Sequence, residues 1–296
     1  MRITQSMLSS NSLRNLSESY RRMGKYEDQL ATGKKITKPS DDPVVAMKGM
    51  YYRSNLTEVE QYKRNLSELY LWMDNSEAGI DQANNALQRV RELTIQGKND
   101  TNSTDDRKAI AREIDQLKQS LAATANTQVS GRYIFHGTDV MKPVVTKENP
   151  VEVATNLADA QINNYQVEVS RGVSMKANVN PANVFNQEMF DTVQKIQAQL
   201  ESADPQGLDD LLNDLDKVMN TLSAERSELG ARYNRLERVE NRLGQQEVMA
   251  TKILSDNEDA EIERVIMDLK SQESVHRAAL SVGARVIQPT LMDFLR

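Results

Sequence analysis

The sequence predicts a mainly α-helical fold, in which a long antiparallel helical rod of coiled-coil type is built from both termini and carries a small inserted β-rich domain. Three observations lead to this prediction. Glycine and proline are sparse, with 12 and 7 among 296 residues. Two long segments place apolar residues at every seventh position, which is the repeat of a coiled-coil seam. A short middle segment shows the two-residue alternation that is typical of strands.

The first helix is predicted over residues 4–32, and Gly33 provides its C-terminal stop. Asp42 and Pro43 predict the start of a second helix, because aspartate caps free N–H groups and proline at the first helical position loses no hydrogen bond. The apolar residues of the first helix are spaced by three and four positions and form one narrow stripe: Leu13, Leu16, Tyr20, Met23 and Leu30.

The second helix is predicted from Pro43 to about Gly97, and a third from a cap at Thr104 to about Gly131. The second helix carries two lines of a heptad seam. These lines are Val59, Leu66, Met73, Ile80 and Leu87, and Tyr62, Leu69, Ser76, Ala83 and Val90.

Toward the C-terminus, leucines recur at every seventh position, at Leu208, Leu215, Leu222, Leu229, Leu236 and Leu243, with Leu211, Val218, Val239 and Ile253 on the adjacent line. A DNA-binding leucine zipper needs a basic helix before such a run. Residues 191–207 instead contain one lysine and three acidic side chains. We therefore interpret the run as a bundle seam that packs against the helix starting at Pro43.

The middle of the chain differs in character. Residues 132–137 are short, aromatic and β-branched, which predicts a strand. Residues 165–170 and 173–179 alternate between apolar and polar side chains on either side of Arg171-Gly172, which predicts a β-hairpin. The helices predicted after it span about 181–203, from Asp204-Pro205 onward, and about 260–295.

The predicted domains are residues 1–45 with 255–296 as terminal helical assembly segments, residues 46–135 with 185–254 as the helical rod, and residues 136–184 as the β-rich outer domain. The first terminal segment has a net charge of +3 and the second of −3, which favours their pairing as antiparallel helices. They are either ordinary helices of one bundle or an association module that exposes its remaining faces to neighbouring subunits. The predicted subunit-assembly residues are Leu13, Leu16, Tyr20, Met23, Leu30, Ile266, Leu280, Ile287, Leu291 and Phe294.

Most enzyme chemistry is excluded by composition. The chain has no cysteine, so it has no disulfide, thiolate metal site or cysteine nucleophile. His136 and His276 are 140 positions apart, and we interpret both as structural or surface residues and Trp72 as a residue of the bundle flank. A net charge of −6 argues against nucleic-acid binding. No run of 18 apolar residues occurs, so no membrane insertion is predicted.

Two acidic stretches are better explained by helix capping than by a site. Asp100 to Asp106 superficially resembles a calcium loop, but its sixth position is Asp105 instead of glycine and its twelfth is Ala111 instead of glutamate. Ser40-Asp41-Asp42 has no nearby histidine for a hydrolytic triad. We therefore predict no catalytic, cofactor-binding or metal-ligating residues, and no cofactor.

Motifs at both ends resemble the flagellin superfamily over roughly residues 1–140 and 205–296. They are Met1-Arg2-Ile3-Thr4, Leu30-Ala31-Thr32-Gly33-Lys34-Lys35-Ile36, Pro39-Ser40-Asp41-Asp42-Pro43, Gly131-Arg132-Tyr133-Ile134-Phe135-His136-Gly137-Thr138, Gly230-Ala231-Arg232-Tyr233-Asn234-Arg235-Leu236-Glu237 and Leu254-Ser255-Asp256 with Glu258-Asp259-Ala260. The run from Pro39 to Pro43 is similar to the hook–filament junction proteins of this superfamily. The motif from Gly230 and the ending Phe294-Leu295-Arg296 are similar to flagellins, so a minor filament-forming flagellin is the alternative.

The resemblance implies a structural adaptor of the bacterial flagellum, without catalysis, that serves motility. It implies that the terminal segments form an inner helical shell, with the rod around it and the β-rich domain outermost. The implied partners are hook-associated protein 1, flagellin, copies of the chain itself in a ring, and a flagellar export chaperone before secretion. It further implies type III export without a cleaved signal peptide, and hence an extracellular location.

Overall fold

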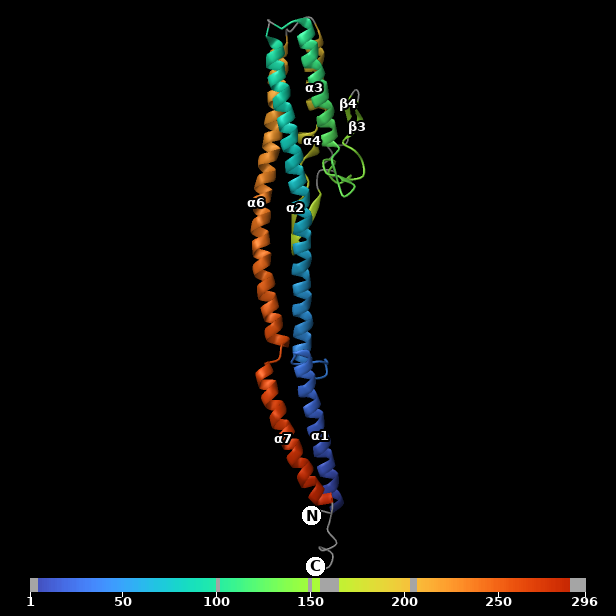
Figure 1. The fold of residues 1–296 in the computed structure, drawn as a ribbon, viewed down its shortest axis with the longest axis vertical. Coiled ribbons are helices and arrows are strands. Elements are labelled where there is room, and N and C mark those ends of the chain that lie inside the picture. The colour runs from blue at the N-terminus through green and yellow to red at the C-terminus, as the bar shows by residue number, and fades with distance from the viewer. Residues whose placement is uncertain (1–4, 100–101, 149–150, 155–164, 203–206, 288–296) are drawn as a thin grey trace, which may run out of the picture. The chain divides into compact units, whose positions relative to one another are not determined.

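The structure is a computed structural model, and it describes residues 5–99, 102–148, 151–154, 165–202 and 207–287. The fold is mainly α-helical with a small β region, as predicted (Figure 1). Its helices are α1 (Gln5–Thr32), α2 (Pro43–Lys98), α3 (Thr104–Ala125), α4 (Pro181–Val184), α5 (Gln187–Glu201), α6 (Leu208–Glu258) and α7 (Ile262–Ile287). Its strands are β1 (Gln128–Val129), β2 (Arg132–Tyr133), β3 (Val145–Glu148), β4 (Val151–Val153), β5 (Gln166–Ser170) and β6 (Val173–Lys176).

The chain divides into two compact units. The terminal unit comprises residues 1–58 and 246–296, and the central unit comprises residues 59–245. The terminal unit is therefore larger than the predicted terminal segments, because it also includes the first turns of α2 and the last turns of α6. Among the described residues, no helix combines the length and hydropathy needed to cross a membrane.

Side-chain caps explain where several helices begin. The Asp42 carboxylate accepts the backbone N–H groups of Val44 and Val45 at 2.9 and 3.1 Å, so the predicted start of α2 is confirmed. The predicted cap of α3 was wrong by one position, since Ser103 forms a reciprocal capping box with Asp106. Asn126 ends α3 earlier than predicted.

The segment predicted as one helix over residues 181–203 is divided in two. Asn180 caps α4 and Asn186 caps α5 through its side-chain oxygen, which accepts the backbone N–H of Met189 at 2.8 Å. A second cap within the segment interrupts the series of helical hydrogen bonds. The pattern of apolar residues does not reveal this interruption. The predicted start signal Asp204-Pro205 and the end of the last predicted helix lie outside the described residues.

Both predicted heptad runs form the core of the central unit. All six leucines from Leu208 to Leu243 are buried, as is every residue of the first line on α2. Ion pairs along the two helices join Lys98 to Asp209, Arg91 to Asp216 and Arg226 to Glu77. Because residue numbers fall along one helix as they rise along the other, α2 and α6 are antiparallel, as Figure 1 also shows. Ile253 was wrongly placed on the seam, since its side chain is exposed.

Within the described residues, the strands form three separate antiparallel pairs, β1–β2, β3–β4 and β5–β6, and not one small sheet. The predicted hairpin is confirmed as β5–β6, with Gly172 in the left-handed conformation at its turn. The strand predicted over residues 132–137 was too long, since β2 ends at Tyr133. The next two residues turn into the core, where Phe135 lies edge-on to Phe185 with ring centroids 4.8 Å apart.

A buried polar cluster joins the inserted region to α6. The Glu225 carboxylate accepts the backbone N–H of Asn180 at 2.8 Å and the side-chain amide of Asn183 at 3.0 Å. Arg232 donates to the backbone carbonyl of Asn178 at 2.8 Å. Glu225 and Arg232 occupy the adjacent heptad line between Val218 and Val239, so this line is apolar only where it faces apolar partners.

Candidate assembly site of the terminal unit

Exposed apolar side chains are concentrated in the terminal unit. Of the large hydrophobic residues that are exposed in the described part of the chain, all lie in this unit except Leu71, Ile95, Met141 and Tyr233. A soluble monomer rarely exposes large apolar patches unless they bind a partner. The terminal unit is therefore the candidate assembly site.

Helices α1 and α7 pack against each other along this unit (Figure 1), as the opposite charges of their segments predict. Of the ten predicted assembly residues, Leu13, Tyr20, Leu30, Ile266 and Leu280 are exposed, whereas Leu16 and Met23 are half-buried. Ile287 is the last residue of α7, but its side chain is outside the described part, as are Leu291 and Phe294 altogether. The structure thus brings two predicted assembly stripes into one helical pair.

An apolar groove runs between the two helices. Its volume is about 230 Å³, and its lining residues are Ser12, Leu13, Leu16, Ala279, Leu280, Gly283 and Ala284. An added Cβ at Gly283 would meet no atom within 4 Å, so this glycine leaves open space beside the leucines. The groove has the shape and chemistry to receive an apolar side chain.

Polar contacts fix the register of α1 against α7. Ser19 is buried, and its hydroxyl accepts the side-chain amide of Gln272 at 2.8 Å. The Nδ1 atom of His276 lies 3.3 Å from the same hydroxyl, and its ring is 6.0 Å from the ring of Tyr20. His276 therefore takes part in a polar contact between the two helices.

Two motifs from opposite ends of the sequence meet beside this pair. The backbone N–H of Ala260 donates to the carbonyl of Gly33 at 2.8 Å, and the N–H of Lys35 donates to the carbonyl of Glu258 at 2.7 Å. The Lys34 ammonium donates to the Asp259 carboxylate at 2.6 Å. Gly33, with φ of 68°, ends α1 in the left-handed conformation that lets the chain turn toward α7.

The Glu258 carboxylate is the buried centre of this joint. It lies 2.8 Å from the Arg53 guanidinium and 3.6 Å from the Lys34 ammonium. A Cβ at position 49 would lie 2.4 Å from Glu258 Oε1, so only glycine allows this approach. Asn257 donates its side-chain amide to the carbonyl of Val45 at 3.1 Å. Sequence reasoning missed this joint, although both of its motifs were recognised.

The joint also makes the terminal unit sensitive to acid. The hydrogen bonds from Lys34 and then from Ser255 lower the pKa of Asp259 below its usual value of 3.8. A lowered pKa in the folded state means that the ionised carboxylate stabilises the fold above pH 3.8. This contribution is lost as the pH falls from there through the folded pKa.

We expect Asp259→Asn to lower the midpoint of thermal unfolding at about pH 6, and the difference from the unmodified chain to shrink as the pH falls from 3.8 through the lowered pKa of Asp259. Melting followed by circular dichroism across this range measures the effect. Because the pair is half-exposed, the effect is expected to be small. Asp256→Asn is the matched control, since Asp256 is an exposed residue in the last turn of α6, three positions before Asp259. A difference that persists or grows in acid contradicts the assignment.

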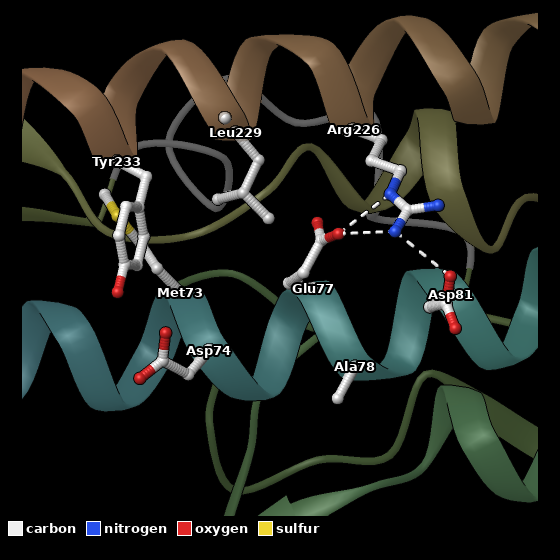
Figure 2. Close-up of a pocket in the computed structure, with 9 residues that line it drawn as sticks. Met73, Asp74, Glu77, Ala78, Asp81, Arg226, Leu229 and Tyr233 are labelled. Carbon is white, nitrogen blue, oxygen red and sulfur yellow. Dashed lines mark hydrogen bonds and ion pairs between the residues drawn. The ribbon is translucent and has the colours of Figure 1, made fainter.

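A second, more polar groove lies between α2 and α6 in the central unit, with a volume of about 660 Å³ (Figure 2). Arg226 binds Glu77 at 2.7 Å and Asp81 at 3.0 Å on one side. On the other side, the Asp74 carboxylate raises the pKa of Tyr233. These contacts hold two helices of the seam together.

The histidine and tryptophan side chains lie in structural settings. His136 is buried, with Nδ1 2.8 Å from the backbone carbonyl of Lys142. Trp72 is buried against the ring of Tyr165, at a centroid distance of 5.4 Å. Within the described ranges, no group of three or more His, Asp or Glu side chains is arranged to hold a metal ion.

Comparison with known proteins relates the N-terminal part of the chain to a family. The family model of the bacterial flagellin N-terminal helical region matches residues 3–139. Residues 3–139 are thus similar to the N-terminal helical region of the bacterial flagellins.

The chain is also similar to flagellar hook-associated protein 3. The protein of that name from Escherichia coli K12 is 31% identical over 138 residues, which cover 46% of this chain and 44% of the relative. A flagellin from Clostridium tyrobutyricum is 29% identical over 127 residues, or 43% of this chain and 34% of the relative. The matched region therefore spans less than half the length of these curated relatives.

Solved structures share the fold over a larger part of the chain. A putative flagellar hook-associated protein from Vibrio parahaemolyticus covers 74% of this chain and is itself covered completely, with a TM-score of 0.66 and 21% identity. The flagellar junction protein FlgL from Legionella pneumophila covers 71% of this chain and 99% of its own, with a TM-score of 0.59 and 17% identity. The predicted fold class is confirmed by these likenesses.

Proposed function

We propose that the chain is a structural adaptor subunit of the bacterial flagellum that joins the hook to the flagellin filament and has no catalytic role. The observation that carries this proposal is the concentration of exposed apolar side chains on the terminal unit. The similarity to flagellar hook-associated protein 3 supports the junction role in particular. The proposed location is extracellular, after export without a cleaved signal peptide.

The proposed neighbours are hook-associated protein 1 on the hook side, flagellin on the filament side and further copies of the chain in a ring. An export chaperone is proposed to bind the chain before secretion, since exposed apolar stripes promote aggregation in the cytoplasm. Burial of the stripes on α1 and α7 provides the free energy of assembly, because removing apolar surface from water is the main driving force of association. The polar contacts at Ser19 orient the stripes.

Deletion of the gene in the source bacterium tests the junction role. We expect hooks to be present, filaments to be absent and flagellin to be released into the medium. Expression of the full chain from a plasmid restores filaments, and electron microscopy with antibody labelling places the chain at the hook–filament boundary. Normal filaments in the deletion strain are incompatible with this role.

A minor filament-forming flagellin is the second candidate, because the C. tyrobutyricum flagellin is nearly as similar as the hook-associated protein. The purified chain is mixed with filament seeds to separate the two. A junction subunit adds at most a short cap to each seed. Long filaments made of this chain alone favour the flagellin.

Assembly through the termini predicts that the free chain is cleaved first at its ends. We expect limited proteolysis of the monomer to trim both ends and to leave a helical core of about residues 45–255, because apolar stripes without partners protect their helices poorly. Mass spectrometry of the fragments over time measures this. Uniform resistance from end to end contradicts the idea that assembly stabilises the terminal segments.

A further inference from the structure

A second apolar surface of the terminal unit lies on α2, away from the groove between α1 and α7. We call it the α2 face, and it consists of Val44, Met47, Met50 and Tyr51, with exposed fractions of 56 to 68%. The spacing of three, four and seven residues places all four on one side of the helix. The opposite side holds Gly49, which is buried against Glu258. The α2 face therefore points away from the joint and toward solvent.

The beginning of α7 presents another exposed apolar surface. We call it the α7 face, and it consists of Ile262, Ile266 and Met267, of which Met267 is 66% exposed. Val265, between them in sequence, is buried on the inner side of the helix. The α7 face thus remains open to solvent although the helix itself is packed.

The two faces carry opposite charge at their margins. Residues 43–57 of α2 include no carboxylate, and Lys48 is their available cation because Arg53 is paired with Glu258 in the joint. Residues 261–268 include three carboxylates and one guanidinium, and at about 100° per residue Glu263 is the carboxylate that lies beside Ile266 and Met267. All of these side chains belong to exposed residues. Each face therefore combines an apolar centre with a charge that complements the other, which is the pattern that orients two docking surfaces.

From this complementarity we propose that the α2 face of one subunit docks on the α7 face of a second copy of this chain. Both faces belong to the terminal unit and are open in the monomer. A contact between two different surfaces is head-to-tail, and it produces a ring when the rotation closes. The inference rests on the proposed function in that it identifies the surfaces by which neighbouring subunits of the junction meet.

The absence of cysteine from the chain allows a clean crosslinking test. Met47→Cys and Met267→Cys are introduced together into the full chain, which is expressed in the deletion strain, and isolated flagella are oxidised. We expect a ladder of dimers, trimers and larger disulfide-linked species on a non-reducing gel. Each single variant is expected to give no ladder. A disulfide between the two cysteines of one molecule leaves that molecule a monomer.

Met141→Cys combined with Met267→Cys is the matched control, because Met141 is also an exposed methionine, at 75%, but lies in the central unit. It is expected to give no ladder. An equal ladder from the control overturns the proposal. The proposal is also overturned if the chain with Met47→Cys and Met267→Cys is present in the flagella but gives no ladder. That result leaves the proposed function intact. Absence of the unmodified chain from flagella contradicts the proposed function instead.

A charge exchange gives a second measurement that needs no cysteine. Lys48→Glu and Glu263→Lys are each expected to lower the amount of chain incorporated into flagella several-fold, because each places like charges together. The combined variant restores incorporation. Arg53 is left unchanged, because it holds Glu258 in the joint. If the double variant incorporates no better than the single variants, the proposed pairing of the two faces is wrong. This test remains valid if the cysteine variants fail to assemble.

Discussion

Leu280→Asp is expected to abolish incorporation of the chain into flagella while leaving the stability of the central unit unchanged. Leu280 is 46% exposed and lines the groove between α1 and α7 together with Leu13 and Leu16. In the free chain a carboxylate at this position remains in contact with water. In the assembly it is removed from water among apolar side chains, and an unpaired buried charge costs several kcal/mol.

Leu71→Asp is the control for this effect, because Leu71 has the same exposed fraction of 46% but belongs to the central unit. It is expected to incorporate normally. Incorporation is measured by immunoblotting isolated flagella against the total chain secreted into the medium. Normal incorporation of the Leu280 variant contradicts the assembly role. A fall in the stability of the terminal unit identifies Leu280 as an ordinary packing residue of the α1 and α7 pair.

Phe135→Ala is expected to destabilise the central unit by about 3–5 kcal/mol. Its ring is fully buried and fills the space next to Gly79, where an added Cβ would lie 2.5 Å from the ring. Truncation removes apolar contacts from two elements at once, since the ring also meets Phe185 edge-on. The backbone of α2 cannot collapse into the resulting cavity without bending.

Fluorescence of Trp72 during urea unfolding measures this loss, because Trp72 is the one tryptophan of the chain and is buried in the central unit. Met141→Ala is the control, and a change of less than about 0.5 kcal/mol is expected for this exposed residue. A similarly small change for Phe135→Ala contradicts its role as a core residue.

Most of the fold could be predicted from local patterns. The first heptad line of α2 and the leucine line of α6 are buried as predicted, because a seven-residue repeat returns to the same side of a helix every two turns. The hairpin around Gly172 was also predicted, since alternation and a turn glycine are local signals. The predictions were wrong where contacts with other parts of the chain decide whether a side chain is buried. Ile253 continues the repeat but lies in the terminal unit, beyond the seam of the central unit.

The candidate site was predicted only in part. The stripes on α1 and α7 follow helical spacing, so their exposed members could be identified from sequence. The α2 face could not, because Met47 and Met50 do not repeat in sevens and only the burial of Gly49 shows which side of the helix is free. In the sequence, nothing distinguishes Glu258 from other charged residues at helix ends. Only the structure shows that Arg53 and Lys34 surround its carboxylate.

The sequence by itself determined the helical class, the seams and the absence of cysteine chemistry, because these depend on residue type and on spacing along one helix. Only the tertiary structure decided which apolar stripes remain open and which segments join the terminal unit. Lys34 and Asp259 are separated by 225 positions. No periodicity within a helix links such residues, and exposure depends on what packs from elsewhere in the chain. The surfaces available for assembly are therefore a property of the fold.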